Sequence, residues 1–401
     1  MIQKAIKKIP KWTVASFLLF TEVQTQESCN EMYWTSQCYG NHFDDSFWMD
    51  FEYLYWKIKD SPAPIPLVYR APANSVFANL GDPGTRVVMG GRDVPNHWQS
   101  GARFSLGSIV DCRKCYGVEA SYFFLPSNSY SQTVSSDGSI GSESLRIPFF
   151  NIITLKNDST GLALPGVFSG TATLKIENRM QGVEFNVLAR YSNYYCMRVT
   201  ALGGLRYWNF KEDLTFDTSS PFVIPPIDIY QTKDQFNTEN NFYGGQIGLL
   251  FAYNCGRFFL DAKGKFAVGA ICGRVLIDGY LLTNDYNNFM DVQKFSGGYF
   301  ALPSDIGKHY STKLSVFPEI NFNFGYQLSD NMQIKLGYSC LYVTKVLWAT
   351  QQIDDNINGD QATTYTNSLI VSLGGQQRPG TLLKTEDLWI QGLNISFVIE
   401  F

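Results

Sequence analysis

Hydrophobic and polar residues alternate with a period of two over long stretches of this chain. Between residues 313 and 327, one face of the pattern carries Leu314, Val316, Pro318, Ile320, Phe322, Phe324 and Tyr326. The opposite face carries mostly polar residues, among them Lys313, Glu319, Asn321 and Asn323. Such alternation predicts a β-strand with two different surroundings. A strictly apolar face of this length is typical of strands of about 9–11 residues that contact lipid.

Ten such runs are present, and the connections between them alternate between short and long. The runs are 46–58, 98–110, 116–132, 177–190, 196–210, 239–253, 257–272, 311–327, 332–347 and 386–401. We therefore predict an all-β transmembrane barrel of about ten antiparallel, up-and-down strands, with short periplasmic turns and long outer loops. The connection 133–176 could hold one more hairpin, which leaves twelve strands open. A soluble secreted β-sandwich would also alternate, but its loops should not alternate so regularly in length.

The final run supports the barrel. Residues Trp389, Gln391, Leu393, Ile395, Phe397, Ile399 and Phe401 share one face, and an aromatic residue stands last. This arrangement resembles the C-terminal signal of bacterial outer-membrane proteins. Strands in lipid must satisfy every backbone N–H and C=O, and only a closed sheet does so.

Composition agrees with β-structure and excludes other classes. Of the 401 residues, 15% are aromatic and only 17% are charged, against about 25% charged in typical soluble proteins. The net charge of −4 argues against a basic nucleic-acid surface. After the N-terminus there is no apolar run of about 18 residues, which a helical membrane span would need.

The N-terminus resembles a secretory signal. Four lysines, the last at Lys11, precede the short apolar run 12–20. We predict a signal peptide over 1–28, a periplasmic segment over 29–45 and the barrel over 46–401. A buried N-terminal helix is the alternative. Export would place the cysteines in an oxidising compartment, where they can pair.

Several motifs in the first half of the chain carry a family resemblance. In order, they are EYLYW at 52–56, PIPLV at 64–68, LGDPGT at 80–85, SGARFSLG at 100–107, GVEASYFFL at 117–125 and RIPFFN at 146–151. Together with GGLRY at 203–207 and GLN at 392–394, they resemble the seventh of the numbered beta-barrel porin families, known mainly from planctomycetes and chlamydia-like bacteria. The resemblance spans nearly the whole mature chain. It implies an outer-membrane barrel, and the porin label implies a channel.

Sequence motifs give little support to an enzyme. The three histidines, His42, His97 and His309, lie far apart and in no metal-binding spacing. The CxxC motif at 112–115 falls in a strand-to-strand turn, which favours structural thiols or a disulfide over a zinc or redox site. We therefore predict no catalytic residues, no metal and no cofactor, although a membrane hydrolase is not ruled out by the sequence.

Charged residues gather on the face of the strands that should point away from lipid. We predict that the pore is lined by Arg103, Glu119, Glu184, Arg190, Arg198, Arg206, Arg257, Asp261, Lys263, Lys265, Lys313, Glu319 and Lys335. With Lys345, Asp50, Glu52 and Glu400, this face counts ten basic and seven acidic residues. The excess predicts weak anion preference in a water-filled channel for small hydrophilic solutes or ions. The alternative is a ladder of ion pairs that fills a narrow, non-conducting structural or surface-binding barrel.

Six of the eight cysteines map to the predicted periplasmic end. They are Cys29, Cys38, Cys112, Cys115, Cys196 and Cys255. We predict that these thiols form disulfides, either within the rim or with neighbouring envelope proteins. The expected partners are therefore outer-membrane lipid, small solutes, and envelope proteins or further copies of the chain.

Overall fold

A computed structural model describes residues 47–111, 115–194, 196–223, 228–284, 291–361, 363–366 and 375–401. The predicted signal peptide (1–28) and periplasmic segment (29–45) lie outside these residues. Ten long strands dominate the described chain. They are β1 (Phe47–Ile58), β4 (Trp98–Ile109), β5 (Tyr116–Ser136), β8 (Gly170–Tyr194), β9 (Met197–Ser219), β10 (Tyr230–Cys255), β11 (Phe258–Asn284), β13 (Gly307–Ser329), β14 (Met332–Leu347) and β16 (Thr385–Glu400).

These ten strands close into an antiparallel barrel. Each strand pairs with its neighbours in the order β1, β4, β5, β8, β9, β10, β11, β13, β14 and β16, and β16 pairs back with β1. Tight turns join the hairpins at one end, which we call the short-turn end. At the turn between β10 and β11, Gly256 has a φ of 63°, a left-handed conformation that glycine adopts without a steric penalty. The predicted fold class is confirmed.

The connection 133–176 does contain a further hairpin, but it does not enter the barrel wall. Its strands, β6 (Ser144–Asn151) and β7 (Lys156–Ala163), belong to a second sheet with β2 (Pro66–Ala71), β3 (Arg86–Gly90) and β15 (Asn356–Ile357). The barrel therefore has ten strands, and the twelve-strand alternative is wrong for the part of the chain that the structure describes.

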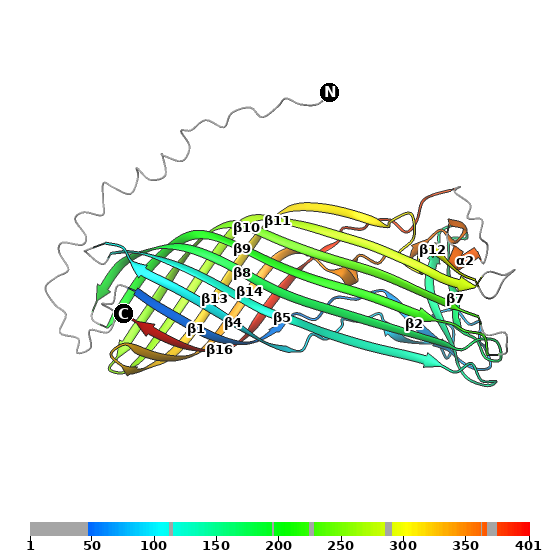
Figure 1. Ribbon diagram of the computed structural model, residues 1–401, viewed down its shortest axis with the longest axis horizontal. Helices are drawn as coiled ribbons and strands as arrows, with labels where there is room; N and C mark the ends of the chain where they lie inside the picture. Colours follow the sequence, from blue (N-terminus) through cyan, green and yellow to red (C-terminus); the bar gives the residue numbers. More distant parts are fainter. Residues whose placement is uncertain are drawn as a thin grey trace, which may run out of the picture.

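This second sheet lies at the opposite, long-loop end of the barrel (Figure 1). Three short helices, η1 (Ala349–Gln351), η2 (Gly359–Gln361) and α2 (Thr363–Thr366), and the short strand β12 (Val292–Ser296) accompany it. Loop residues such as Ile147 and Phe300 form one buried cluster with strand residues such as Leu174, Phe216 and Phe236. We call this assembly of loops the cap, and it packs into the outer part of the barrel.

The outward face of the strands falls into two zones. Nearest the short-turn end it is apolar, with exposed side chains that include Phe51, Phe104, Phe185, Leu205, Ile247, Leu249, Phe251, Leu260, Phe322 and Leu336. We call this zone the apolar band. Beyond it the strands continue as a polar extension, whose outward residues include Lys175, Arg179, Lys211, Asp217, Lys233 and Asn237.

Six of the ten strands, β5, β8, β9, β10, β11 and β13, reach farther into the long-loop end than the sequence predicts. β10 begins at Tyr230 rather than 239, and β11 ends at Asn284 rather than 272. In the polar extension the outward face is no longer apolar, so the lipid-facing signal used to delimit the runs ends there. At the short-turn end, where the apolar band begins, the predicted and observed boundaries nearly coincide.

Candidate functional site: the barrel lumen

Four charged side chains meet in the middle of the lumen, and we call them the ionic lock. They are Glu184 from β8, Arg206 from β9, Lys265 from β11 and Glu319 from β13. Arg206 donates to both carboxylates. Lys265 Nζ lies 2.9 Å from both carboxylate oxygens of Glu184 and 3.0 Å from Glu319 Oε2. These side chains are only 0–4% exposed.

The lock is connected to the opposite wall. Arg103 on β4 lies 3.5 Å from Glu319 on β13 and 3.2 Å from Glu52 on β1. In the barrel order, three strands lie between β4 and β13 in one direction and five in the other. A contact between them therefore crosses the lumen rather than following the wall.

Further ion pairs lie between the lock and the short-turn end. Lys263 Nζ contacts Glu119 at 2.6 Å. Lys335 lies between Asp50, at 3.5 Å, and Asp261, at 3.8 Å. Their side chains are 12–23% exposed, so these charges are more accessible to solvent than those of the lock.

On the other side of the lock, the lumen is filled by aromatic rings. Trp208, Phe210, Phe242 and Phe317 are buried and contact one another with ring centroids 5.7–6.0 Å apart. The Arg206 guanidinium lies 4.3 Å from the centre of the Phe317 ring. We call these rings the aromatic layer. Together with the cap, they exclude water from the long-loop side of the lock.

Burial of charge explains the pairing within the lock. A lone ion removed from water costs several kcal/mol, and this cost is offset only when opposite charges and hydrogen bonds surround it. The lock contains two acids and two bases, and Gln246 adds a 3.0 Å hydrogen bond from its Nε2 to Glu184 Oε2. The cluster is therefore neutral as a whole, and each of its charged side chains is paired with another member of the cluster.

Most of the predicted pore-lining residues face the interior. Arg103, Glu119, Glu184, Arg206, Asp261, Lys263, Lys265, Glu319 and Lys335 form the network above. Lys313 also faces inward and donates to Thr385 Oγ1 at 3.1 Å. Arg190 and Arg198 lie half-buried at the short-turn ends of β8 and β9.

Two of the basic residues counted as inward-facing are not in the lumen. Arg257 is exposed in the turn between β10 and β11, where the chain reverses and strand alternation no longer applies. Lys345 is exposed at a β-bulge between Val343 and Val346 and has a φ of 65°; the extra residue shifts the alternation. Without them, the inward face holds eight basic and seven acidic residues, so the predicted excess of positive charge nearly vanishes.

Sequence reasoning missed the uncharged half of the site. Besides Gln246, the residues Asn186, Asn321, Ser339 and Asn394 are buried in the lumen. Ser339 Oγ donates to Asn321 at 2.6 Å, and Asn321 Nδ2 donates to Glu319 Oε1 at 3.0 Å. In the sequence, these residues alternate with apolar outward residues, which would have predicted that they face the lumen. A count of charged residues alone overlooks amides and hydroxyls.

In the polar extension, buried carboxylates hold the cap loops. Asp234 accepts hydrogen bonds from the backbone N–H groups of Tyr299, Phe300 and Ala301 at 2.7–3.0 Å. Glu212 accepts from Ser61 Oγ at 2.5 Å and from Ala349 N at 2.7 Å. Burial raises the pKa of Glu212 to about 7 and that of Asp234 to about 6, against the partial compensation of these hydrogen bonds.

The predicted cysteine pairs are not present between described residues. No disulfide joins any two of Cys115, Cys196, Cys255, Cys272 and Cys340. Cys29, Cys38 and Cys112 lie outside the described residues. Cys115, Cys196 and Cys255 do lie at the short-turn end.

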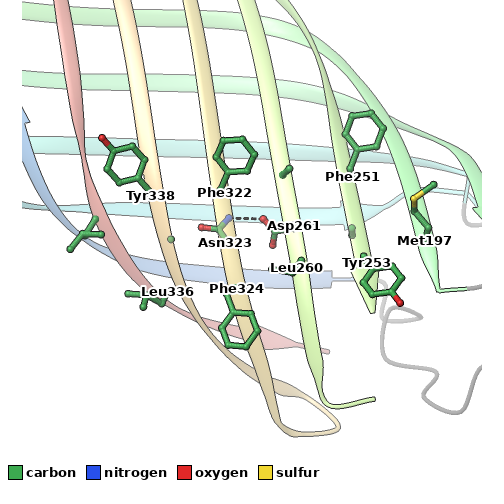
Figure 2. Close-up of a pocket in the computed structure, with 14 residues that line it drawn as sticks. Met197, Phe251, Tyr253, Leu260, Asp261, Phe322, Asn323, Phe324, Leu336 and Tyr338 are labelled. Carbon is green, nitrogen blue, oxygen red and sulfur yellow. Dashed lines mark hydrogen bonds between the residues drawn. The ribbon is translucent and has the colours of Figure 1, made fainter. Parts of the chain in front are cut away.

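Other kinds of site find little support in the described chain. Its helices are all too short or too polar to cross a membrane. Within the same residues, no group of three or more His, Cys, Asp or Glu side chains is placed to bind a metal ion. An apolar hollow of about 540 Å³ lies on the outer wall, where Phe251, Phe322, Phe324, Leu336 and Tyr338 surround it (Figure 2). Its position on the apolar band makes it a surface for hydrocarbon rather than a route for solutes.

Comparison with protein families decides the class of this barrel. The model of the family described as "Putative beta barrel porin-7 (BBP7)" matches residues 48–401. The chain belongs to this family. It is therefore an outer-membrane type of β-barrel, whose apolar band contacts membrane lipid.

Solved structures with a similar outline include the outer-membrane protease OmpT of Escherichia coli, with 11% sequence identity, a TM-score of 0.40, and coverage of 89% of this chain and 97% of that chain. A FadL homologue of Pseudomonas aeruginosa has 9% identity and a TM-score of 0.23, covering 89% and 91% of the two chains. The toluene transporter TodX of P. putida has 9% identity and a TM-score of 0.21, covering 89% and 90%. No curated protein sequence matches the chain.

Proposed function

We propose that the protein is a closed barrel of the outer membrane of a Gram-negative-type bacterium, and that it presents its cap at the cell surface. The observation that carries this proposal is the ionic lock, four mutually paired charges whose side chains are 0–4% exposed in mid-lumen. In this orientation the short-turn end faces the periplasm, as is usual for outer-membrane barrels. The protein would then act as a membrane anchor for a surface-binding module.

Two features make passage through this barrel costly. A solute would have to separate paired charges in a dry environment, which is strongly unfavourable when one partner is left alone. It would then have to displace the aromatic layer and the cap, which together fill the lumen on the outer side. Narrow barrels are commonly filled by side chains in this manner.

Conductance of the full chain in planar lipid bilayers tests this proposal. We expect the folded wild type to show no stepwise current. The double variant Glu184→Gln with Glu319→Gln leaves Arg206 and Lys265 without their partners, so it should admit water as far as the aromatic layer. Because that layer and the cap still fill the outer side, it should produce only rare, brief current steps. The matched control, Glu177→Gln with Glu239→Gln, removes two carboxylates from the outer wall and should stay silent. Stable open-pore currents from the wild type would refute the closed barrel.

Labelling of intact cells tests the orientation. Ile140 in the cap is 93% exposed, so an Ile140→Cys variant should react with a membrane-impermeant maleimide. Cys255, exposed at the short-turn end, should react only after the outer membrane is disrupted. Equal labelling of wild type and variant on intact cells would contradict the orientation.

Passive diffusion of small hydrophilic solutes, with weak anion preference, is the second candidate. The family's description as porins favours it, and so do the partly exposed charges on the periplasmic side of the lock. Arg206 Nη1 and Gln246 Oε1 are buried without a hydrogen-bond partner among the described residues, and such atoms commonly bind ordered water. If the wild type conducts, its reversal potential in a salt gradient measures the ion preference. Near balance of the inward charges favours a small value.

Covalent links to envelope proteins or to further copies of the chain are also proposed. Cys255 is exposed at the short-turn end, where an oxidising periplasm would favour pairing of an accessible thiol. Gels of native envelopes without reductant should show higher-mass species that disappear on reduction. Unchanged mobility, together with full alkylation of the thiols, would exclude these links.

A further inference from the structure

The outer wall of β8, β9, β10 and β11 changes character in a regular order along the strands. At the edge of the apolar band, Tyr207 and Tyr243 lie directly opposite each other, with ring centroids 5.1 Å apart. Two residues farther along each strand come the amides Gln181, Asn209 and Asn241, which are also in register. Two residues beyond these stand Arg179, Lys211, Glu239 and Arg274, again in register. We call this last set the basic row.

The basic row holds more positive charge than its own acid balances. Glu239 lies 2.7 Å from both Lys211 and Arg274. Arg179 makes no direct hydrogen bond or ion pair with any described residue, and its recorded electrostatic attraction is to Asp213 and Glu177 in the neighbouring row. Arg179 and Lys211 are directly opposite in the pairing of β8 and β9, and like charges at such positions destabilise a sheet unless something lies between them.

The acids Glu177 and Asp213 restrict where an anion can approach. They form the next row outward and are also directly opposite each other. Their negative charge disfavours an anion from that side, so the favourable position lies on the side of the amides and tyrosines. The basic row can therefore bind an anion on its side nearest the apolar band.

Between the tyrosines and the short-turn end, the outer wall is an apolar surface that hydrocarbon chains can contact. Phe185, Leu205 and Ile247 are 51–69% exposed there. Gly203 and Gly245 lie among them, and a Cβ atom at either position would have no neighbour closer than 3.9 Å. A flat, apolar wall with shallow recesses accommodates extended acyl chains.

We propose that this wall binds an anionic lipid of the outer leaflet through its phosphate. The order apolar wall, tyrosine, amide and cation matches the order of acyl chain, polar linkage and phosphate in such a lipid. Arg and Lys are the usual ligands of phosphate groups, and basic side chains beside an aromatic belt commonly bind lipid head groups. This site lies outside the barrel and does not depend on whether the lumen conducts.

Lipid retention by the full chain tests the proposal. The wild type, in detergent micelles doped with phosphatidylglycerol or phosphatidylcholine, is analysed by native mass spectrometry for bound lipid. We expect at least about tenfold preferential retention of phosphatidylglycerol, and its loss in the double variant Arg179→Gln with Lys211→Gln. The matched control, Lys175→Gln with Lys233→Gln, removes two outward lysines from the same wall farther from the apolar band and should retain the preference.

Further arms keep the outcome decisive. Inorganic phosphate in excess should not displace the lipid, because it lacks acyl chains; full displacement would mean a simple anion site and would overturn the proposal. Equal retention of the two lipids by the wild type, or unchanged preference in the double variant, would also overturn it. If the double variant does not fold, the single variant Arg179→Gln provides the test, since Arg179 makes no direct ion pair and would lose only its attraction to Asp213 and Glu177.

Discussion

The apolar band and the polar extension are built by the same strands, but they reverse which face is apolar. On β10 the band presents Leu249 and Phe251 outward and buries Gln246, whereas the extension presents Gln235 and Asn237 outward and buries Phe236. Lipid surrounds the first zone and water the second. The medium around each zone thus determines which residues lie inside. Polar side chains lie inside the barrel where the outer face is apolar, and apolar side chains lie inside where the outer face is polar.

The two zones are consequently stabilised by different forces. In the polar extension, burial of Phe216, Phe236 and the cap loops removes apolar surface from water, as in a soluble domain. In the apolar band, the outward side chains face lipid rather than water, so burying apolar surface gives no hydrophobic gain there. Backbone hydrogen bonds and the paired charges of the lumen therefore contribute more of the stability. The same kind of substitution should therefore change stability by different amounts in the two zones.

The largest effect is expected from breaking the lock. Arg206→Met leaves Glu184 and Glu319 with one cation between them in a dry site. It should lower the free energy of unfolding, measured by urea titration in lipid vesicles, by about 3–5 kcal/mol. Lys175→Met, an exposed outward change on β8, should have almost no effect. Equal stability of both variants would show that the lock is hydrated.

A charge on the outer wall should discriminate between the two zones. Leu249→Arg places a cation on the apolar band and should lower the free energy of unfolding by about 2–4 kcal/mol. Gln235→Arg, on the same face of the same strand in the polar extension, should change it by less than about 0.5 kcal/mol. Similar losses in the same urea titrations would place both residues in one environment and remove the distinction between the zones.

The polar extension should also respond to pH through Glu212. Because burial raises the folded-state pKa of Glu212 to about 7, above its ordinary value of 4.5, the folded protein binds this proton more tightly. Its contribution is fully present below about pH 4.5 and falls on the order of 3 kcal/mol as the pH rises through 7. The neighbouring carboxylate of Asp213 also raises the pKa of Glu212.

Comparison with a Glu212→Gln variant isolates this contribution. Melting temperatures in detergent between pH 4.5 and 8 should fall less steeply for the variant than for wild type, in which Asp234 and Asp305 also have raised pKa values. Parallel curves would mean that Glu212 is ionised at neutral pH in the folded protein.

The smallest effect concerns a single hydrogen bond in the cap. The Tyr365 hydroxyl donates to the carbonyl oxygen of Tyr299 at 2.8 Å. Tyr365→Phe should lower the stability of the cap by about 1 kcal/mol, detectable as faster hydrogen exchange at residues 299–302. Tyr310→Phe, an exposed outward change on β13, is the control and should leave exchange unchanged.

The strand count could be predicted because lipid contact imposes a one-sided apolar pattern on each strand. The same reasoning failed where that contact ends. It shortened β10 and β11, and it missed the cap sheet, whose strands pack against loops and carry no lipid-facing pattern. It also misplaced Arg257 and Lys345, because a turn and a bulge interrupt alternation at single residues that periodicity cannot locate.

The sequence could predict which residues of the candidate site face the lumen, but not which of them pair with one another. Alternation assigns Arg206 and Glu319 to the interior, since charges avoid lipid. Their pairing is another matter, because the two residues are 113 positions apart and lie on strands that are not neighbours. Which strands face each other across the lumen depends on the closure and stagger of the whole barrel.

By itself, the sequence determined a barrel of about ten strands, its lipid-facing side and the residue types of its interior, because period-two alternation is a local consequence of strand geometry. Only the tertiary structure decided that the interior charges neutralise one another, that aromatic rings close the lumen beyond them, and that the long loops fold into the barrel. Those outcomes depend on distances between residues remote in the chain, and the balance of Coulombic attraction, desolvation and packing is set only when the barrel closes.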